Sequence, residues 1–434
     1  MPSGASAPAA GVPARAGRYG DGRHSLLSVL GSSLSFARRL LSALALVLLA
    51  APAVAQPVTG GGADARLHLG PLALDPRLSV RDVGIDTNIF NDAEAPVRDF
   101  TAVIGPELDS WVRLGRLYWS GTSAVRWNYY RENRSQRSID LAQDGRLDLD
   151  LGIVMPFVRG HAGRTRQRPN LEIDARVQLD TRDLAGGFGL RFGPSTFVSL
   201  EHGARQVEFG DVRLGEATLA ETLNRTETAS RVALQRALTP LTTLNVAAEY
   251  RSDDFETAVD RDSESYRLVG GLDLRPLALV AGRALVGVRS FRPDSPMAPR
   301  FTGTVADVEL TYQFRDLTRL MGLVARDIDY SYDPAQAYYV STAWRLSAIQ
   351  ALGPGWDITA HAGRTRLAYR SRLDATIDER DRRDHVLVYG LGFGRRLGTD
   401  MRVGVEIEYG TRRSSVRDRT YEGLRGGGTF SYGF

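Results

Sequence analysis

The chain has 434 residues, of which 43% are hydrophobic and 24% charged, and it contains 45 glycines, 16 tyrosines and 15 phenylalanines. This composition excludes a disordered chain and a helical membrane protein. Cysteine is absent, which excludes a disulfide scaffold and a structural zinc site held by thiolates. The formal net charge is only +4, and all 55 basic residues are arginine. This small excess does not predict a nucleic-acid partner, which usually requires a dense basic face.

The first predicted element is an export signal at residues 38–55. Arg38 and Arg39 supply the positive start, residues 40–50 form a short apolar stretch, and the segment ends at an Ala-Val-Ala cleavage site. The apolar stretch is well short of the roughly 20 residues that a membrane-spanning helix needs. We therefore expect residues 1–55 to be an N-terminal extension plus a cleaved signal peptide, exported by the general secretory route.

After residue 55 the recurring pattern is an alternation of apolar and polar residues with a period of two, which predicts β-strands. Val405 and Ile407 share one face of such a run, and Arg402 and Glu406 share the other. Comparable runs cover residues 117–129, 242–251, 266–275, 306–314 and 338–346. These runs are longer than the about 5–6 residues typical of strands in soluble proteins. They suit tilted membrane strands, which need about 9–11 residues in the apolar zone.

Two kinds of connection alternate strictly between the predicted strands. Polar and often long connections lie near residues 90–99, 130–137, 166–172, 209–222, 253–263, 292–300, 331–337, 371–383 and 413–420. Short connections with Gly, Pro or Asp lie at residues 113–116, 151–155, 193–195, 238–241, 275–278, 315–318, 352–355 and 397–400.

The nine long loops and eight short turns together define eighteen strands. The strands near 77–88 and 172–192 are the least regular, so we allow sixteen to twenty strands. Bacterial outer-membrane barrels have an even number of strands, short periplasmic turns and longer external loops. The sequence thus predicts an all-β fold, a transmembrane antiparallel up-and-down β-barrel over residues 77–434, preceded by a short periplasmic segment at residues 56–76.

The chain ends with three aromatic residues at alternate positions, Phe430, Tyr432 and Phe434. This ending resembles the terminal strand by which the barrel assembly machinery recognises outer-membrane barrels. The resemblance implies that these residues act as an assembly signal, that the machinery is a partner, and that the protein is integral to the outer membrane.

Residues 78–90 read LSVRDVGIDTNIF, and Asp86, Asn88 and Phe90 form the core of this segment. The segment resembles the opening strand of the putative β-barrel porin 2 family. Related barrels occur alongside exopolysaccharide export genes, so the resemblance implies that polysaccharide export components could be partners. The alternative is structural: the segment is a strand leading into a loop, with Asp and Asn shaping the turn.

The sequence offers no sign of catalysis or of a bound cofactor. Its six histidines form no close metal-ligand pair, and it lacks a nucleophile elbow, a phosphate-binding loop and a His-Glu-x-x-His pattern. We therefore predict that the protein is not an enzyme and has neither a cofactor nor a metal site. An outer-membrane hydrolase stays open as an alternative, because a Ser-His pair on barrel strands would leave no motif.

Charged side chains on the polar faces of the predicted strands are candidates for lining the lumen. They are Arg126, Glu249, Arg267, Arg275, Asp307, Glu309, Arg345, Arg402, Glu406 and Glu408. Opposed Arg and acidic bands would bias which solutes enter a pore, and the mixed signs argue against strong selectivity for either charge. The alternative is a hydrated wall of compensating charges, each of which adds little stability.

Four predicted loops are rich in arginine, at residues 131–137, 164–168, 378–384 and 412–419. We expect them near the outer-membrane lipid and lipopolysaccharide, where arginine can bind phosphate with two hydrogen bonds. Ordinary solvated loop charge is the alternative.

The sequence predicts two candidate functions: a water-filled pore for solutes or secreted polysaccharide, and a plugged structural barrel whose loops bind a surface polymer or partner. Inward-folding loops would favour the second, and a clear lumen would favour the first.

Overall fold

The computed structural model describes residues 62–275, 279–315, 317–375, 382–416 and 419–433. The predicted export signal and extension at residues 1–55 therefore lie outside the described residues, and so does Phe434. Eighteen long strands are present: β2 (Leu72–Asp86), β3 (Asp99–Leu114), β4 (Leu117–Tyr130), β5 (Ser138–Leu149), β6 (Val154–Gln167), β7 (Val177–Phe192), β8 (Thr196–Phe209), β11 (Arg225–Thr239), β12 (Thr242–Phe255), β13 (Ser263–Leu274), β14 (Val280–Pro293), β15 (Phe301–Phe314), β16 (Thr318–Tyr330), β17 (Gln336–Gly353), β18 (Trp356–Ser371), β19 (Arg383–Leu397), β20 (Met401–Arg413) and β21 (Tyr421–Tyr432).

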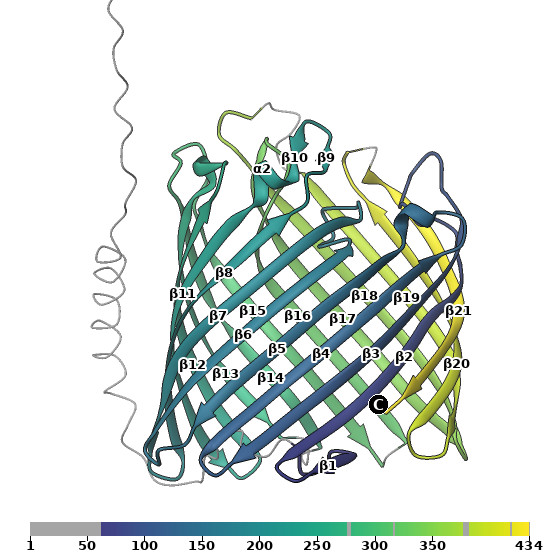
Figure 1. Cartoon of the computed structure of the whole chain (residues 1–434). Helices are drawn as coiled ribbons and strands as arrows, with labels where there is room; N and C mark the ends of the chain where they lie inside the picture. The colour runs from purple at the N-terminus through teal and green to yellow at the C-terminus, as the bar shows by residue number, and fades with distance from the viewer. Residues whose placement is uncertain (1–61, 276–278, 316, 376–381, 417–418, 434) are drawn as a thin grey trace, which may run out of the picture. The chain divides into compact units, whose positions relative to one another are not determined.

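The eighteen strands form one closed antiparallel barrel (Figure 1). Each strand pairs with the strand before it, and β2 closes the circle by pairing with β21, where Leu78 lies opposite Tyr432 and Asp86 opposite Arg425. The predicted fold class and strand count are confirmed. Long loops gather at one end of the barrel, here called the loop end, and short turns at the other, the turn end (Figure 1).

Smaller elements lie at the two ends of the barrel. A three-residue strand, β1 (Leu67–Leu69), pairs with the start of β2 at the turn end. A short hairpin, β9 (Arg213–Leu214) with β10 (Ala217–Thr218), and the helix α2 (Leu219–Leu223) lie at the loop end (Figure 1). Two single 3-10 turns occupy Arg134–Gln136 and Val259–Arg261. Among the described residues, no helix has the length and apolar character needed to cross a membrane.

Two strand starts differ from the sequence-based expectation. β2 begins at Leu72 rather than at residue 77, although it contains Pro76. β1 pairs with β2 only up to Leu74 and β21 pairs with it only from Leu78, so the missing N–H of Pro76 interrupts neither ladder. β7 begins at Val177 rather than near residue 172, because the preceding residues form a loop with other contacts.

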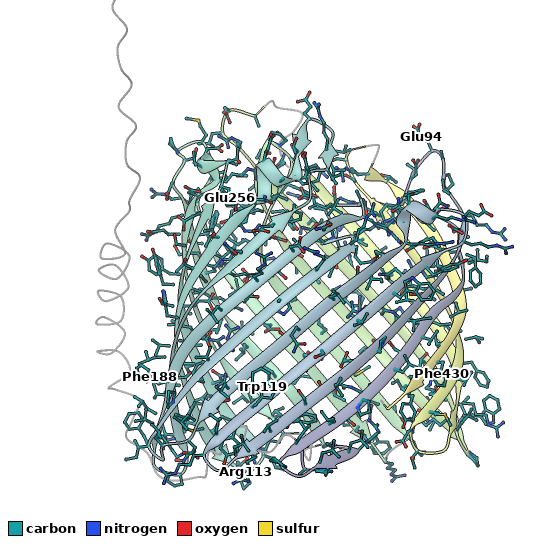
Figure 2. All side chains as sticks on the ribbon, in the orientation of Figure 1. Glu94, Arg113, Trp119, Phe188, Glu256 and Phe430 are labelled. Atoms are coloured by element: carbon teal, nitrogen blue, oxygen red, sulfur yellow. The ribbon has the colours of Figure 1, made fainter. Side chains whose placement is uncertain are left out.

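Strand register places exposed apolar residues on the outer face of the barrel. Val405 is 61% exposed, and its partner Phe393 is also exposed. Trp119, Phe188 and Phe430 project from the outer wall towards the turn end (Figure 2), which is the position of an aromatic girdle.

The last strand continues this pattern. Phe430 lies opposite Val403, and Tyr432 lies opposite Met401, in the β20–β21 ladder. Val403 and Met401 are both exposed on the outer face. Because directly opposed residues point to the same side of a sheet, Phe430 and Tyr432 share that outer face.

The β16–β17 hairpin leans into the barrel at the loop end. β15 pairs with β16 only over Ala306–Phe314, so the last residues of β16 leave the wall. Tyr330, at the end of β16, donates a hydrogen bond to Asp253 of β12 at 2.6 Å, and its ring meets Phe255 with centroids 4.8 Å apart. Contact with a strand four positions away requires the hairpin to bend inwards.

Candidate functional site

The family-like segment joins the first and last strands at the loop end. Asp86 accepts a hydrogen bond from the backbone N–H of Asn88 at 2.9 Å and pairs with Arg425 of β21 at 3.2 Å. The Asn88 side chain donates to the backbone oxygen of Glu422 at 3.0 Å. Asp86 and Asn88 are buried, whereas Phe90 is 39% exposed. Asp and Asn here shape a turn and fasten the closing seam of the barrel.

The predicted lumen residues are spread around the wall rather than gathered in one site. In β20, Arg402 pairs with Asp357 at 2.6 Å. The Glu408 carboxylate accepts a hydrogen bond from the ring of His361 at 3.1 Å, and Glu406 lies near the same ring. These side chains alternate with the exposed Val405 and Ile407, so they lie on the inner face.

The remaining predicted lumen residues occupy five other strands and one turn. Glu249 of β12 lies directly opposite Arg267 of β13, and Glu309 of β15 lies opposite Arg283 of β14. The others are Arg126 on β4, Asp307 on β15, Arg345 on β17 and Arg275 just past the end of β13.

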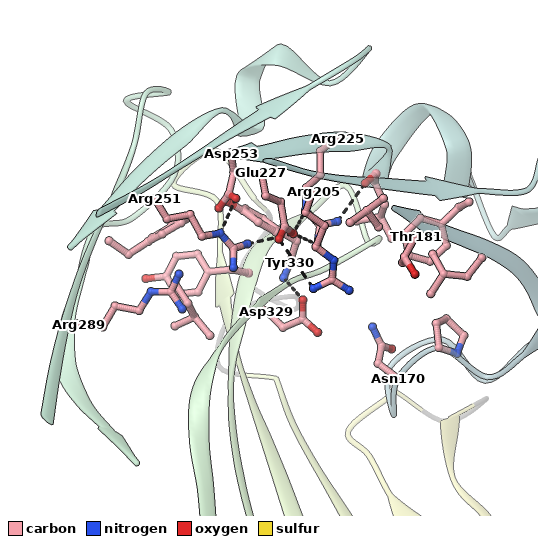
Figure 3. Close-up of a pocket in the computed structure, with 18 residues that line it drawn as sticks. Asn170, Thr181, Arg205, Arg225, Glu227, Arg251, Asp253, Arg289, Asp329 and Tyr330 are labelled. Atoms are coloured by element: carbon pink, nitrogen blue, oxygen red, sulfur yellow. Dashed lines mark hydrogen bonds and ion pairs between the residues drawn. The ribbon is translucent and has the colours of Figure 1, made fainter. Parts of the chain in front are cut away.

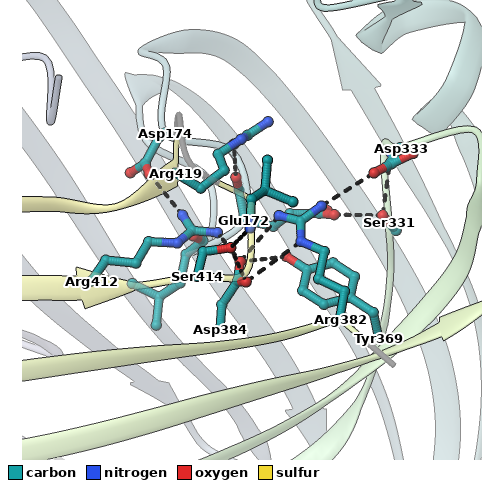
Figure 4. Close-up of polar contacts among 12 residues, drawn as sticks. Glu172, Asp174, Ser331, Asp333, Tyr369, Arg382, Asp384, Arg412, Ser414 and Arg419 are labelled. Atoms are coloured by element: carbon teal, nitrogen blue, oxygen red, sulfur yellow. Dashed lines mark hydrogen bonds and ion pairs between the residues drawn. The ribbon is translucent and has the colours of Figure 1, made fainter. Parts of the chain in front are cut away.

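One polar cluster at the loop end was not predicted from the sequence. It is built on residues 168–176, the connection between β6 and β7, here called the latch loop. Glu172 and Ile173 at its tip are fully buried. The Glu172 carboxylate accepts hydrogen bonds from the hydroxyl of Ser331 and from the backbone N–H of Tyr332, the latter at 3.1 Å (Figure 4). Ser331 and Tyr332 belong to the β16–β17 connection.

The latch loop reaches across the lumen to make these contacts. Going around the wall from β7 to β16 passes six strands, β8 and β11 to β15. Going the other way from β6 to β17 passes eight, β5 to β2 and β21 to β18. The two connections thus stand on nearly opposite sides of the barrel, and their contact spans its loop end.

Arginines from β20 and its neighbours hold the latch loop in place. Arg412 is fully buried, donates to the backbone oxygen of Leu171 at 2.7 Å, and pairs with Asp174 at 2.7 Å and with Asp384 (Figure 4). Arg419 donates to the backbone oxygen of Glu172 at 2.9 Å. These bonds satisfy backbone groups that an inserted loop would otherwise leave unpaired.

The expected placement of the arginine-rich loops is therefore wrong in part. Arg412 and Arg419 turn into the lumen towards the latch loop, and Arg382 is also buried, pairing with Asp384 at 3.1 Å and Asp333 at 3.2 Å. The physical reason is that carboxylates lie inside the loop end, among them the fully buried Asp384, and a buried carboxylate needs a charged partner. Arg164 and Arg166 lie within β6 rather than in a loop.

A second loop covers the same end with apolar contacts. Residues 210–224, here called the cap loop, carry α2, whose Leu219 and Leu223 are buried. They pack in one apolar cluster with Ile173 of the latch loop and with Phe291 and Tyr338 from the wall. The polar latch loop and the apolar cap loop thus share the loop end of the lumen.

Burial raises the pKa of Glu172 to about 8, although the hydrogen bond from Ser331 and the charges of Arg382 and Arg419 act in the opposite direction. Glu172 lies in a connection outside the membrane-spanning strands. The latched position therefore favours the protonated, neutral carboxyl group.

A charged chamber lies next to the latch loop (Figure 3). Arg251 pairs with Glu227 at 3.1 Å and Asp253 at 2.6 Å, and Arg225 pairs with Glu227 at 2.7 Å. Arg289 is bound to Asp327 at 2.8 Å outside this group. The arrangement can hold water and polar solutes. Among the described residues, no three His, Asp or Glu side chains are placed to bind a metal ion together.

Comparison with known proteins gives one family and several barrels. A family model described as "Putative beta-barrel porin 2" matches residues 67–427. A search of curated proteins found no match. Among solved structures, the outer membrane protein OpdK of Pseudomonas aeruginosa is 11% identical, with a TM-score of 0.46 and coverage of 83% of this chain and 98% of that one. OccK2 (OpdF) of Pseudomonas aeruginosa, in complex with glucuronate, is 13% identical, with a TM-score of 0.46 and coverage of 83% and 97%. The siderophore receptor PirA of Acinetobacter baumannii is 8% identical, with a TM-score of 0.40 and coverage of 83% and 80%.

Proposed function

Because the chain belongs to the putative β-barrel porin 2 family and is an integral outer-membrane barrel, we propose that it is a channel for small hydrophilic solutes whose external mouth is held narrow by the latch loop. The observation that carries this proposal is the charged inner face. Arg402, Glu406 and Glu408 alternate with exposed apolar residues on a single strand. Charged side chains that face a barrel interior need water or solute around them. A barrel of this strand number leaves an aqueous lumen unless it is plugged.

The latch loop limits what can pass. It crosses the loop end of the lumen between β7 and the β16–β17 connection, and the cap loop packs beside it. Secreted polysaccharide would need the latch loop to be released, whereas small solutes need only the space that it leaves. We therefore propose small solutes rather than polysaccharide as the substrates of the channel. Polysaccharide export components would be partners only if the latch loop opens.

A second candidate function rests on the same loop. If the latch and cap loops close the lumen completely, the protein is a plugged barrel whose external loops bind a surface polymer or partner. The buried Glu172 and Ile173 favour this candidate, because both are fully enclosed.

Single-channel recording of the mature protein in planar bilayers distinguishes the two. We expect discrete conductance steps from the wild type, and larger steps from a variant in which residues 169–175 are replaced by a short Gly-Ser linker. A wild type that never conducts, combined with a linker variant that does, would establish the plugged barrel. Absence of conductance in both would refute the channel.

A further inference from the structure

The lumen wall has a recess near the turn end that the latch loop does not touch. It is lined by side chains from β4, β5, β6, β8, β11, β12 and β14. Met155, Phe157 and Phe197 all lie within four residues of the turn-end start of their strands, so the recess opens towards the periplasmic side of a barrel in the usual orientation.

Glycines in β7 make room for this recess. Gly187 and Gly189 lie directly opposite Phe157 and Met155 of β6 and opposite Glu201 and Ser199 of β8. A Cβ atom at Gly189 would lie 2.1 Å from the ring of Phe197. A Cβ atom at Gly187 would lie 2.1 Å from the backbone oxygen of Leu200 and 2.9 Å from the ring of Phe157. The two rings therefore lie against the wall, in space that a side chain at either glycine would occupy.

One of the two rings is already covered. The Arg146 guanidinium lies 4.1 Å from the centre of the Phe157 ring and is held there by Asp148. Phe197 is only half-buried and lines the recess without such a partner among the described residues. It offers a flat apolar surface on which a ring-shaped ligand can stack.

Polar groups without partners surround that surface. Asn245 is 2% exposed and donates to Asp273 at 3.0 Å, but its side-chain oxygen has no hydrogen-bond partner. A buried acceptor left unpaired is costly, so such a group is a candidate for binding a ligand or water. Arg231 has no ion pair or hydrogen bond in the part of the chain that the structure describes, although Glu201 and Glu249 lie opposite it on the neighbouring strands. Glu201 is already paired with Arg159 at 2.7 Å.

Most of the charges that line the recess are already paired. Arg146 is paired with Asp148, Arg283 with Asp273 at 2.6 Å, and Glu201 with Arg159, so among the described residues that line the recess Arg231 is the arginine without an ion pair. A ligand with one carboxylate can therefore pair with Arg231. Several neutral hydrogen-bonding groups, Ser199 and Gln235 among them, stand beside the ring. A polyhydroxylated ring uses such groups, whereas an aromatic acid would use only the arginine and the stacking surface.

We propose that this recess binds a pyranose that carries one carboxylate, with the sugar face on Phe197, the carboxylate at Arg231 and hydroxyl groups at Gln235 and Asn245. The inference rests on the proposed channel function, for which the recess would be a binding station for solutes in transit. Charge-assisted hydrogen bonds to the carboxylate supply most of the specificity, and stacking on the ring selects for the apolar face of a sugar.

Isothermal titration calorimetry on the folded mature protein in detergent tests binding without requiring conduction. The probes are sodium glucuronate, glucose as the neutral sugar, and benzoate as the aromatic acid. We expect saturable binding of glucuronate, weakened about tenfold by Arg231→Gln, which corresponds to the loss of one charge-assisted hydrogen bond. Phe197→Leu and Gly189→Ala should weaken it similarly, the second by displacing the ring. Arg345→Gln, which removes the same charge six strands farther along the wall, is the matched control and should bind as the wild type does.

Current blockade by glucuronate in single channels then connects the recess to transport. Glucuronate binding without conduction would support the binding site in the recess and refute the channel. Conduction without saturable glucuronate binding would refute the binding site in the recess and support the channel. Equal affinity for benzoate and glucuronate, or wild-type binding by Gly189→Ala, would overturn the assignment of a sugar on Phe197.

Discussion

Raising the pH should release the latch loop, because its tip carries a buried carboxyl group. Burial raises the pKa of Glu172 from its ordinary 4.5 to about 8 in the latched position. Once the loop is released into water, the group regains its ordinary value. The latched state therefore binds the proton more tightly, so latching is strongest below pH 4.5 and weakens progressively as the pH rises towards 8.

The size of the effect follows from the same shift. Each pH unit within this window changes the latching free energy by at most about 1.4 kcal/mol, so the whole window weakens the latch by up to about 5 kcal/mol. A latch that holds the mouth closed by a few kcal/mol at low pH would then be mostly open at high pH. Above pH 8 the carboxylate is ionised in both states, and the dependence should level off.

Two measurements check this prediction. Single-channel recordings between about pH 4 and pH 9 should show an open probability that rises with pH and then levels off. Trypsin cleavage after Arg176, at the β7 end of the latch loop, should become faster over the same range. Trypsin reports on the loop even if the barrel does not conduct.

Glu172→Gln is the decisive variant, because it keeps the shape of the side chain and cannot ionise. It should stay latched across the whole range, whereas Glu406→Gln, which removes a carboxylate from the exposed wall, should keep the wild-type response. A Glu172→Gln protein that opens with pH as the wild type does would refute the role of this group. A wild-type protein that opens as the pH falls would refute the predicted direction of the pH dependence.

Three further predictions concern the barrel itself. Val405→Arg should lower the folded yield in lipid, because an arginine on the lipid face costs about 2–4 kcal/mol at the bilayer midplane, whereas Glu406→Gln should fold normally; the reverse result would place β20 in the opposite register. Deleting Phe434, or replacing it with Asp, should reduce heat-modifiable barrel in the outer membrane while leaving export intact, and wild-type amounts would show that the aromatic ending is incidental. Mass spectrometry of protein from outer-membrane fractions should find a mature chain that lacks residues 1–55, and peptides from residues 1–37 on mature protein would contradict the processing site.

The barrel could be predicted because its signals are local. Alternation of Val405 and Ile407 with Arg402 and Glu406 reflects the two-residue period of a strand, and that period fixes the lipid face without knowledge of the neighbours. Turn chemistry separated long from short connections, and their strict alternation determined the strand count. The errors at the starts of β2 and β7 arose where Pro76 and a polar segment masked the local signal.

The latch loop could not be predicted because its signals are distant. Glu172 is separated from Ser331 by 159 residues, and Arg412 is separated from Asp174 by 238. In the sequence, Glu172 stands in an ordinary polar connection and Arg412 in an arginine-rich loop. Only the closed barrel brings these connections to one end. The glycines at 187 and 189 were visible in the sequence, but their meaning depends on the register that places Phe157 and Phe197 beside them.

The two loops that share the external mouth should respond differently to the surroundings because they are held by different forces. The cap loop is held by Leu219 and Leu223 in an apolar cluster, and such contacts are insensitive to pH and become stronger in strongly hydrated salts. The latch loop is held largely by polar contacts of Glu172 and Arg412, and the buried position of Glu172 favours its protonated form. Buried ion pairs add little net stability compared with apolar residues of the same size. A permanent plug would therefore be better built from apolar contacts alone, and the polar construction of the latch loop is what a reversible closure requires.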